Sequence, residues 1–183
     1  MITSEGLTPE ALSSSGKEAY QKAEFKEAAR LFLEANNAFL AIGDKLNAAE
    51  MANNRSVALL QSGEPELAFT AVEGTDTTFA QAGDKRRQAM SLGNRGAAAE
   101  AMGKRKEALL AYQQASELFK EIGEHEHRAF LLRSISSIQL RMGHILEAIV
   151  TMRIGISEIP NPNSFERFSL KILNFFLRRF SIG

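Results

Sequence analysis

The sequence has no cysteine and no tryptophan, and its 183 residues include only 4 prolines and 3 histidines. Without cysteine, a disulfide framework, a thiolate metal site and a cysteine nucleophile are all excluded. An excess of charge of one sign is also missing, because 22 Lys and Arg balance 22 Asp and Glu. Nucleic-acid-binding proteins usually carry a clear basic excess, so this balance argues against a nucleic-acid partner.

Long apolar runs are missing as well, since no stretch approaches the roughly 18 apolar residues of a membrane-spanning helix. The first six residues have neither the basic nor the apolar region of a secretory signal, so we expect no leader and a cytoplasmic location. The hydrophobic fraction of 44% and the charged fraction of 24% are ordinary for a globular protein.

Motifs for catalysis are also lacking. His125 and His127 point to different sides of a predicted helix start, so a metal site is not expected there. The segment 93–96 contains two glycines but lacks the lysine and the hydroxyl of a phosphate-binding loop. The sequence therefore predicts a protein that is not an enzyme, with no cofactor and no metal.

What the sequence does contain is a repeat of itself every 40 residues. Alanine recurs with this spacing at the start of four apolar stretches, at Ala28, Ala68, Ala108 and Ala148. Glycine recurs with the same spacing in two sets, Gly63, Gly103 and Gly143, and Gly43, Gly83 and Gly123. Such self-similarity is typical of stacked helical units, which form an extended binding surface rather than a catalytic cavity.

Apolar residues spaced i, i+3, i+4 and i+7 predict helix through nearly the whole chain. Thr8 and Pro9 are typical of a helix start, and glycine is typical of the position just past a helix end. These signals predict further helices at about 25–42, 46–62, 65–82, 86–102, 105–122, 127–142 and 145–159. We expect a flexible N-terminus (1–8), four repeats over 9–159 (about 9–45, 46–85, 86–125 and 126–159) and a C-terminal amphipathic helix over 163–182.

One of these helices is poor. Gly74 is followed by Thr75, Asp76, Thr77 and Thr78, which are all weak helix formers. Either the segment is frayed or kinked and is held by its neighbours, or it is a hinge that lets a binding groove open.

The clearest repeat covers 92–115, with Asn94, the small residue Gly96, Gly103, Ala108 and Tyr112 in order. This pattern resembles the tetratricopeptide repeat (TPR), in the 40-residue form of kinesin light chain-like arrays. The resemblance covers about 9–159 and implies an all-α fold, a right-handed α-solenoid of four TPR helix pairs, to which we add a C-terminal amphipathic capping helix. It implies a protein-binding scaffold or adaptor.

In that family the first helices of the repeats line a concave groove, and an Asn equivalent to Asn54 and Asn94 grips the backbone of an extended peptide. The alternative is that both amides bond only within the array. Arg55 and Arg95 stand where the family has Leu, and they either pair a nearby carboxylate or meet an acidic partner. The expected groove residues are Asn53, Asn54, Val57, Met90, Asn94, Ala97, Phe130, Arg133, Ser137 and Arg141.

The C-terminal helix carries more apolar residues than one packing face needs. We expect Phe165, Phe168, Ile172 and Phe176 to pack on the fourth repeat. We expect Phe175, Leu177 and Ile182 to contact either a second copy, in a homodimer, or a membrane surface, which basic residues of the same helix would favour. An adaptor, a membrane-surface protein and a homo-oligomeric subunit are thus the three classes of function that the sequence leaves open.

Overall fold

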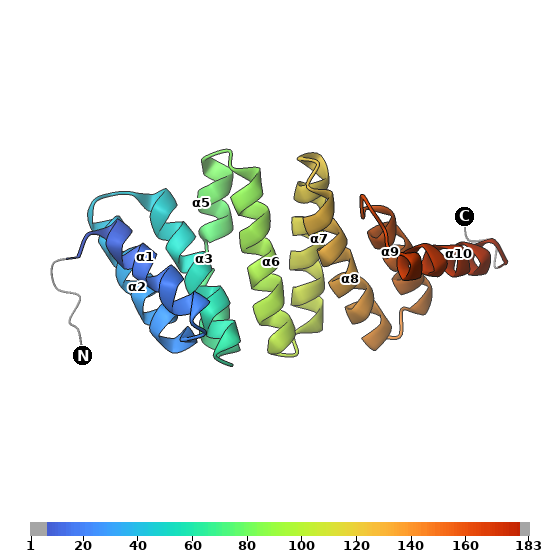
Figure 1. The fold of residues 1–183 in the computed structure, drawn as a ribbon, viewed down its shortest axis with the longest axis horizontal. Coiled ribbons are helices and arrows are strands. Elements are labelled where there is room, and N and C mark those ends of the chain that lie inside the picture. Colours follow the sequence, from blue (N-terminus) through green and yellow to red (C-terminus); the bar gives the residue numbers. More distant parts are fainter. Residues whose placement is uncertain (1–6, 180–183) are drawn as a thin grey trace. The chain divides into compact units, whose positions relative to one another are not determined.

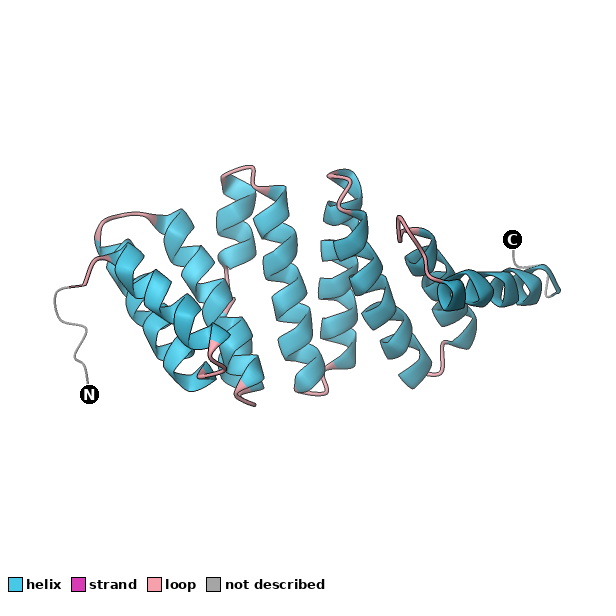
Figure 2. Ribbon diagram, in the orientation of Figure 1, coloured by secondary structure: helices cyan, strands magenta, loops and turns pink. Residues whose placement is uncertain are grey.

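The computed structural model describes residues 7–179, and all the regular structure in that range is α-helix joined by short loops (Figures 1 and 2). The chain divides into two compact units, Met1–Ala108 and Leu109–Gly183, and the boundary falls within α7. Within each unit, consecutive helices pack on one another as in an α-solenoid, which confirms the predicted all-α class. The helices are α1 (Pro9–Gln21), α2 (Phe25–Ala41), α3 (Lys45–Gln61), α4 (Pro65–Ala71), α5 (Thr75–Gln81), α6 (Lys85–Ala101), α7 (Arg105–Glu121), α8 (His125–Arg141), α9 (Ile145–Ser157) and α10 (Ser164–Arg179).

Short, repeated turns set the helix ends. Gly43 has a left-handed backbone with φ of +81°, which side chains other than that of glycine rarely adopt. Glycines at positions 63, 83, 103, 123 and 143 have the same left-handed backbone conformation, as the 40-residue spacing predicts. The next helix then begins two residues later, which forces neighbouring helices to be antiparallel.

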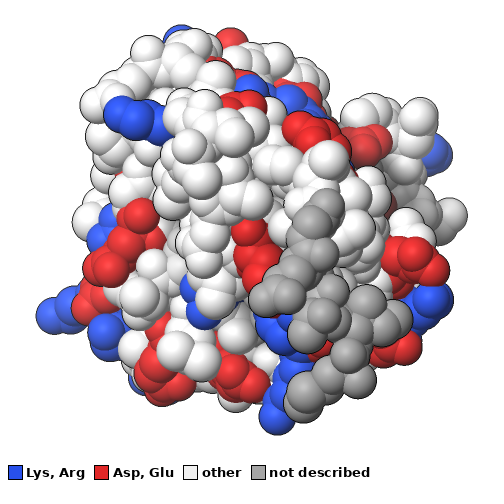
Figure 3. Space-filling view, turned by 90° about the vertical axis from the view of Figure 1, so that its left-hand side faces the viewer, with Lys and Arg blue, Asp and Glu red and all other residues white. Residues whose placement is uncertain are grey.

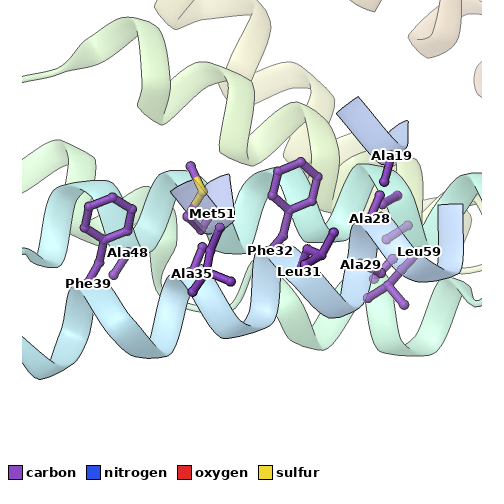
Figure 4. Packing of buried hydrophobic residues seen from close by; sticks show 14 residues of the cluster. Ala19, Ala28, Ala29, Leu31, Phe32, Ala35, Phe39, Ala48, Met51 and Leu59 are labelled. Carbon is purple, nitrogen blue, oxygen red and sulfur yellow. The ribbon is translucent and has the colours of Figure 1, made fainter. Parts of the chain in front are cut away.

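Small residues bring the helices of the first unit close together. Ala28, Ala35 and Ala68 are fully buried, beside larger core residues that include Phe32 (Figure 4). A Cβ atom on Gly16 would lie 2.8 Å from the Phe32 ring, closer than carbon atoms pack, so α1 can cross α2 here only because residue 16 is glycine. The recurring small residues are thus what lets these helices approach closely.

The predicted helix 65–82 is broken into α4 and α5. Gly74 takes a left-handed conformation (φ +74°) between them, and the Thr75 hydroxyl donates a hydrogen bond of 2.8 Å to the carbonyl of Val72. Thr75 is buried, and its hydroxyl is also bonded to that of Ser91 on α6. The segment is therefore kinked and held by its neighbours, which is the first of the two alternatives that the sequence left open.

In the second unit, α8 pairs with α9 and α10 packs on α9. Helix α10 starts with a capping box: the Glu166 carboxylate accepts a hydrogen bond from the Asn163 backbone amide (2.8 Å), and the Asn163 side chain accepts one from the Glu166 backbone amide (2.9 Å). The guanidinium of Arg133 on α8 also binds the Glu166 carboxylate at 2.8 Å. These contacts fix which face of α10 turns inward.

The inward face of α10 differs from the predicted one. Leu177 is only 5% exposed, whereas Phe165, Phe168, Ile172 and Phe176 are exposed. The prediction that these four residues pack on the fourth repeat is therefore wrong, and so is the outward placement of Leu177. The physical reason is helical register, because residues 166, 170, 173 and 177 share one face and Glu166 is held inward. Ile182 lies outside the described residues.

Aspartates cap the N-termini of α3 and α6, each the first helix of a repeat. Asp84 accepts a hydrogen bond of 2.9 Å from the Arg87 amide at the start of α6, as Asp44 does from Asn47 at the start of α3. The Arg87 amide, followed by the Arg87 guanidinium, lowers the pKa of Asp84. A carboxylate whose pKa is lowered by folding stabilises the protein above its unfolded-state pKa of about 3.9 and loses this effect as the pH falls through the lower folded-state value.

We therefore expect Asp84→Ala to destabilise the first unit by about 1 kcal/mol at neutral pH, the usual loss for an N-cap. Asp84→Asn keeps a capping oxygen but cannot titrate, so its stability should fall less steeply below pH ~4 than that of the parent. Urea unfolding followed by circular dichroism between about pH 6 and 2.5 checks both effects. Equal acid dependence in the parent and in Asp84→Asn would contradict this account of the cap.

Candidate binding site

A cavity of about 270 Å³ opens between α1, α2 and α3. Its base is apolar, with the buried Phe32 ring and the half-buried Tyr20 and Val57. The Tyr20 ring is positioned by an edge contact with Phe25, at 5.4 Å between ring centroids. Six residues line the cavity: Lys17, Tyr20, Gln21, Phe32, Asn54 and Val57. Two predicted groove residues, Asn54 and Val57, are therefore brought together in one recess.

The polar rim of this cavity is available to a ligand. Within residues 7–179, the side chains of Asn54 and Lys17 make no hydrogen bond or ion pair. An amide offers a donor and an acceptor together, and an ammonium offers three donors. The arrangement can hold one apolar side chain while its rim binds a peptide group and a carboxylate.

Asn94 occupies the corresponding place on α6. Helices α3 and α6 pack directly on each other, so the two asparagines lie on neighbouring helices. The side chain of Asn94 is half-buried and, like that of Asn54, has no partner in the described part of the chain. Met90 and Ala97 share its helix face at i−4 and i+3. The side-chain amides of Asn54 and Asn94 therefore make no hydrogen bond within the described part of the array, contrary to the alternative that they bond only there.

Asn53 is misplaced in the predicted groove. It is 7% exposed, and its Oδ1 lies 3.4 Å from the Thr75 hydroxyl oxygen, in polar contact with it. Neighbouring residues on a helix point about 100° apart, so a helix that presents Asn54 at the rim turns Asn53 toward α5. Asn53 is a structural residue, and its role belongs to the break between α4 and α5.

The predicted groove residues of the second unit share one face of α8. Phe130, Ser137 and Arg141 are exposed there, and Arg141 donates to the Ser137 hydroxyl at 3.4 Å. Arg133 lies on the same face, but its guanidinium is bound to Glu166 of α10. Of these four side chains, Arg133, Ser137 and Arg141 are thus already engaged within their own unit.

The sequence profile of the soluble NSF attachment protein (SNAP) family matches residues 13–173. The chain belongs to the SNAP family. This family consists of helical, TPR-like solenoid proteins that act as non-catalytic adaptors and bind SNARE and NSF proteins. The prediction of a TPR-type repeat protein with a protein partner is confirmed at this level, while the kinesin light chain-like type stays a prediction. No curated protein matches the sequence significantly.

In this SNAP-family chain, Arg95 has a role that the sequence did not reveal. Its guanidinium lies over the Phe69 ring at 5.5 Å from the centroid, and the ammonium of Lys104 lies 5.1 Å from the same centroid. Cations are attracted to the face of an aromatic ring, so Arg95 contacts an aromatic ring where a carboxylate was expected. Phe69 is far away in sequence, and no local pattern links the three residues.

The structure of this SNAP-family chain also bears on metal binding and on membrane crossing. Within residues 7–179, His, Asp and Glu form no group of three that could hold a metal ion. Over the same range, every helix falls short of the length and apolar character needed to cross a bilayer. Basic and acidic side chains are interspersed on the face in Figure 3. Ion pairs such as those of Arg30 with Glu27 and Glu34 also lie along α2.

Proposed function

We propose that this chain is a non-catalytic cytoplasmic adaptor that binds an extended segment of another protein along α1, α3 and α6. The observation that carries the proposal is the cavity beside Asn54 together with a second unpartnered amide, Asn94, one repeat further on. Membership of an adaptor family supports the same class of function. A site that binds another protein needs apolar surface and available hydrogen-bonding groups. The cavity provides the apolar surface, and the two asparagine amides provide the hydrogen-bonding groups.

The chemistry of the cavity defines the segment that it would take. Phe32, Tyr20 and Val57 form an apolar base that suits one aliphatic or aromatic side chain. Lys17 at the rim suits an acidic residue beside that side chain. The amides of Asn54 and Asn94 each suit one peptide group of the bound backbone.

The proposal is tested by selecting peptides from a random displayed library on the immobilised full-length chain and then measuring their affinities by calorimetry. We expect the selected peptides to carry an apolar residue next to Asp or Glu. Asn54→Ala combined with Asn94→Ala should weaken their binding at least ten-fold, because each lost bidentate contact contributes about 1 kcal/mol or more. Lys17→Glu should weaken them further by repelling the acidic residue.

Asn37→Ala is the matched control, since Asn37 is an exposed amide on α2 and does not line the cavity. This variant should bind as the parent does, and all variants should keep the helical circular dichroism spectrum. If the double variant binds the selected peptides as tightly as the parent does, the two asparagines are not the grip and the proposed site is wrong.

A further inference from the structure

Helix α10 presents an exposed apolar stripe to solvent. Phe165, Phe168 and Phe175 are 76%, 59% and 68% exposed. Ile172 and Phe176 lie in the same stripe and are exposed as well. On a helix of 3.6 residues per turn, these five positions fall within an arc of about 100°. The opposite face of α10, which includes Leu177, packs on α9, so the stripe is in excess of what attaches the helix to its unit.

The charge of α10 is predominantly basic. The helix carries four basic residues, Arg167, Lys171, Arg178 and Arg179, and one acidic residue, Glu166. Glu166 is already neutralised by Arg133 and bound to the Asn163 amide. By helical register, positions 167, 171 and 178 lie together along one flank of the apolar stripe. The outer side of α10 therefore combines aromatic residues with a basic border, whereas the acidic residue of the helix, Glu166, lies on the inward face.

This charge pattern discriminates between the surfaces that could cover the stripe. In an antiparallel pair of α10 helices, the same flank of each copy faces the other, so the basic border would meet itself. Like charges placed in this way are repulsive. An anionic lipid surface has the complementary charge, and the border between headgroups and acyl chains accepts aromatic rings and basic side chains side by side.

We propose that α10 binds in the plane of an anionic lipid surface. Phe165, Phe168 and Phe175 enter the border between headgroups and acyl chains, and Lys171 contacts lipid phosphates. The helix lies on the membrane and does not cross it. This attachment uses no residue of the cavity between α1, α2 and α3, so the two proposed sites are made of separate residues.

The absence of tryptophan allows a site-specific test with the full chain. In Phe175→Trp the new residue is the only tryptophan, so its fluorescence reports on α10 alone. With vesicles of phosphatidylcholine and phosphatidylserine (about 70:30), we expect a blue shift of the emission and co-flotation of the protein. With phosphatidylcholine alone, or at high salt, both should be much weaker. Leu110→Trp, at an exposed position of α7, should show no shift.

A second pair of variants tests the stripe and its charge separately. Phe168→Ser with Phe175→Ser should lower the partition coefficient onto anionic vesicles at least ten-fold, and Lys171→Glu should lower it several-fold. Leu110→Ser is the matched control and should bind as the parent does, with circular dichroism unchanged in all three proteins.

Three results would overturn the proposal. The first is no flotation of the parent with anionic vesicles, and the second is equal binding to neutral and anionic vesicles. The third is a parent that sediments as a dimer and becomes a monomer with Phe168→Ser and Phe175→Ser, because the stripe would then be covered by a second copy. Peptide binding by Asn54 and Asn94 is measured without lipid. A failure of the membrane proposal would therefore leave the peptide-binding result unaffected.

Discussion

Replacing Glu158 with alanine is expected to lower the free energy of unfolding of the second unit by about 3 kcal/mol, the lower end of the loss when one partner of a buried ion pair is removed, because this pair is part-buried. The Glu158 carboxylate follows α9 and binds the guanidinium of Arg128 on α8, with His125 Nδ1 at 2.5 Å. The side chains of Arg128 and Glu158 are only 11% and 14% exposed. Arg128 Nε already lacks a hydrogen-bond partner among the described residues, so Glu158→Ala would leave a charged group largely buried and uncompensated.

Hydrogen exchange of the α8 and α9 amides measures this loss directly in the second unit. Glu147→Ala is the matched control, because Glu147 pairs with His144 at 3.0 Å but is 63% exposed, and such pairs contribute at most about 1 kcal/mol. Arg128→Met combined with Glu158→Met should recover most of the stability, since an apolar pair needs no compensating charge. Exchange rates in Glu158→Ala equal to those in the Glu147→Ala control would contradict the assignment.

The helix ends could be predicted from the sequence because local residues determine them. A glycine such as Gly43 ends one helix through its own backbone, and Asp44 caps the next through a residue three positions on. The capping box of α10 is equally local. The Ala and Gly spacing also indicated which residues let helices approach closely, because every repeat needs a small residue at the same place.

Contacts between residues far apart in sequence could not be predicted in this way. The rotation of α10 depends on the ion pair between Glu166 and Arg133, 33 residues apart, and without it the apolar pattern favoured the wrong face. The buried place of Asn53 depends in the same way on Thr75. For Asn54 and Asn94, the 40-residue spacing predicted equivalent positions, but only the structure shows that the two side chains have no partner within the described chain.

The break between α4 and α5 shows how long-range packing stabilises a segment that is locally poor. Gly74 is followed by threonines at positions 75, 77 and 78. Each threonine disfavours helix by several tenths of a kcal/mol, and the glycine does so by about 1 kcal/mol. Phe79, the next residue, is completely buried, and the guanidinium of Arg87 lies 5.2 Å from its ring centroid. Helix α5 contacts both α3 and α6, so burial of Phe79 offsets the weak local propensity.

We therefore expect Phe79→Ala to destabilise the first unit by about 3–5 kcal/mol, through lost burial and the cavity left behind. This is a large part of the 5–15 kcal/mol by which domains are usually stable, so α5 should lose its exchange protection first. Phe130→Ala removes the same atoms from a side chain that is 67% exposed and should change stability by less than about 0.5 kcal/mol. Hydrogen exchange of the α5 and α6 amides measures the effect. Protection of α5 that survives in Phe79→Ala as in Phe130→Ala would mean that the Thr75 and Ser91 hydrogen bonds, rather than the buried ring, hold this helix.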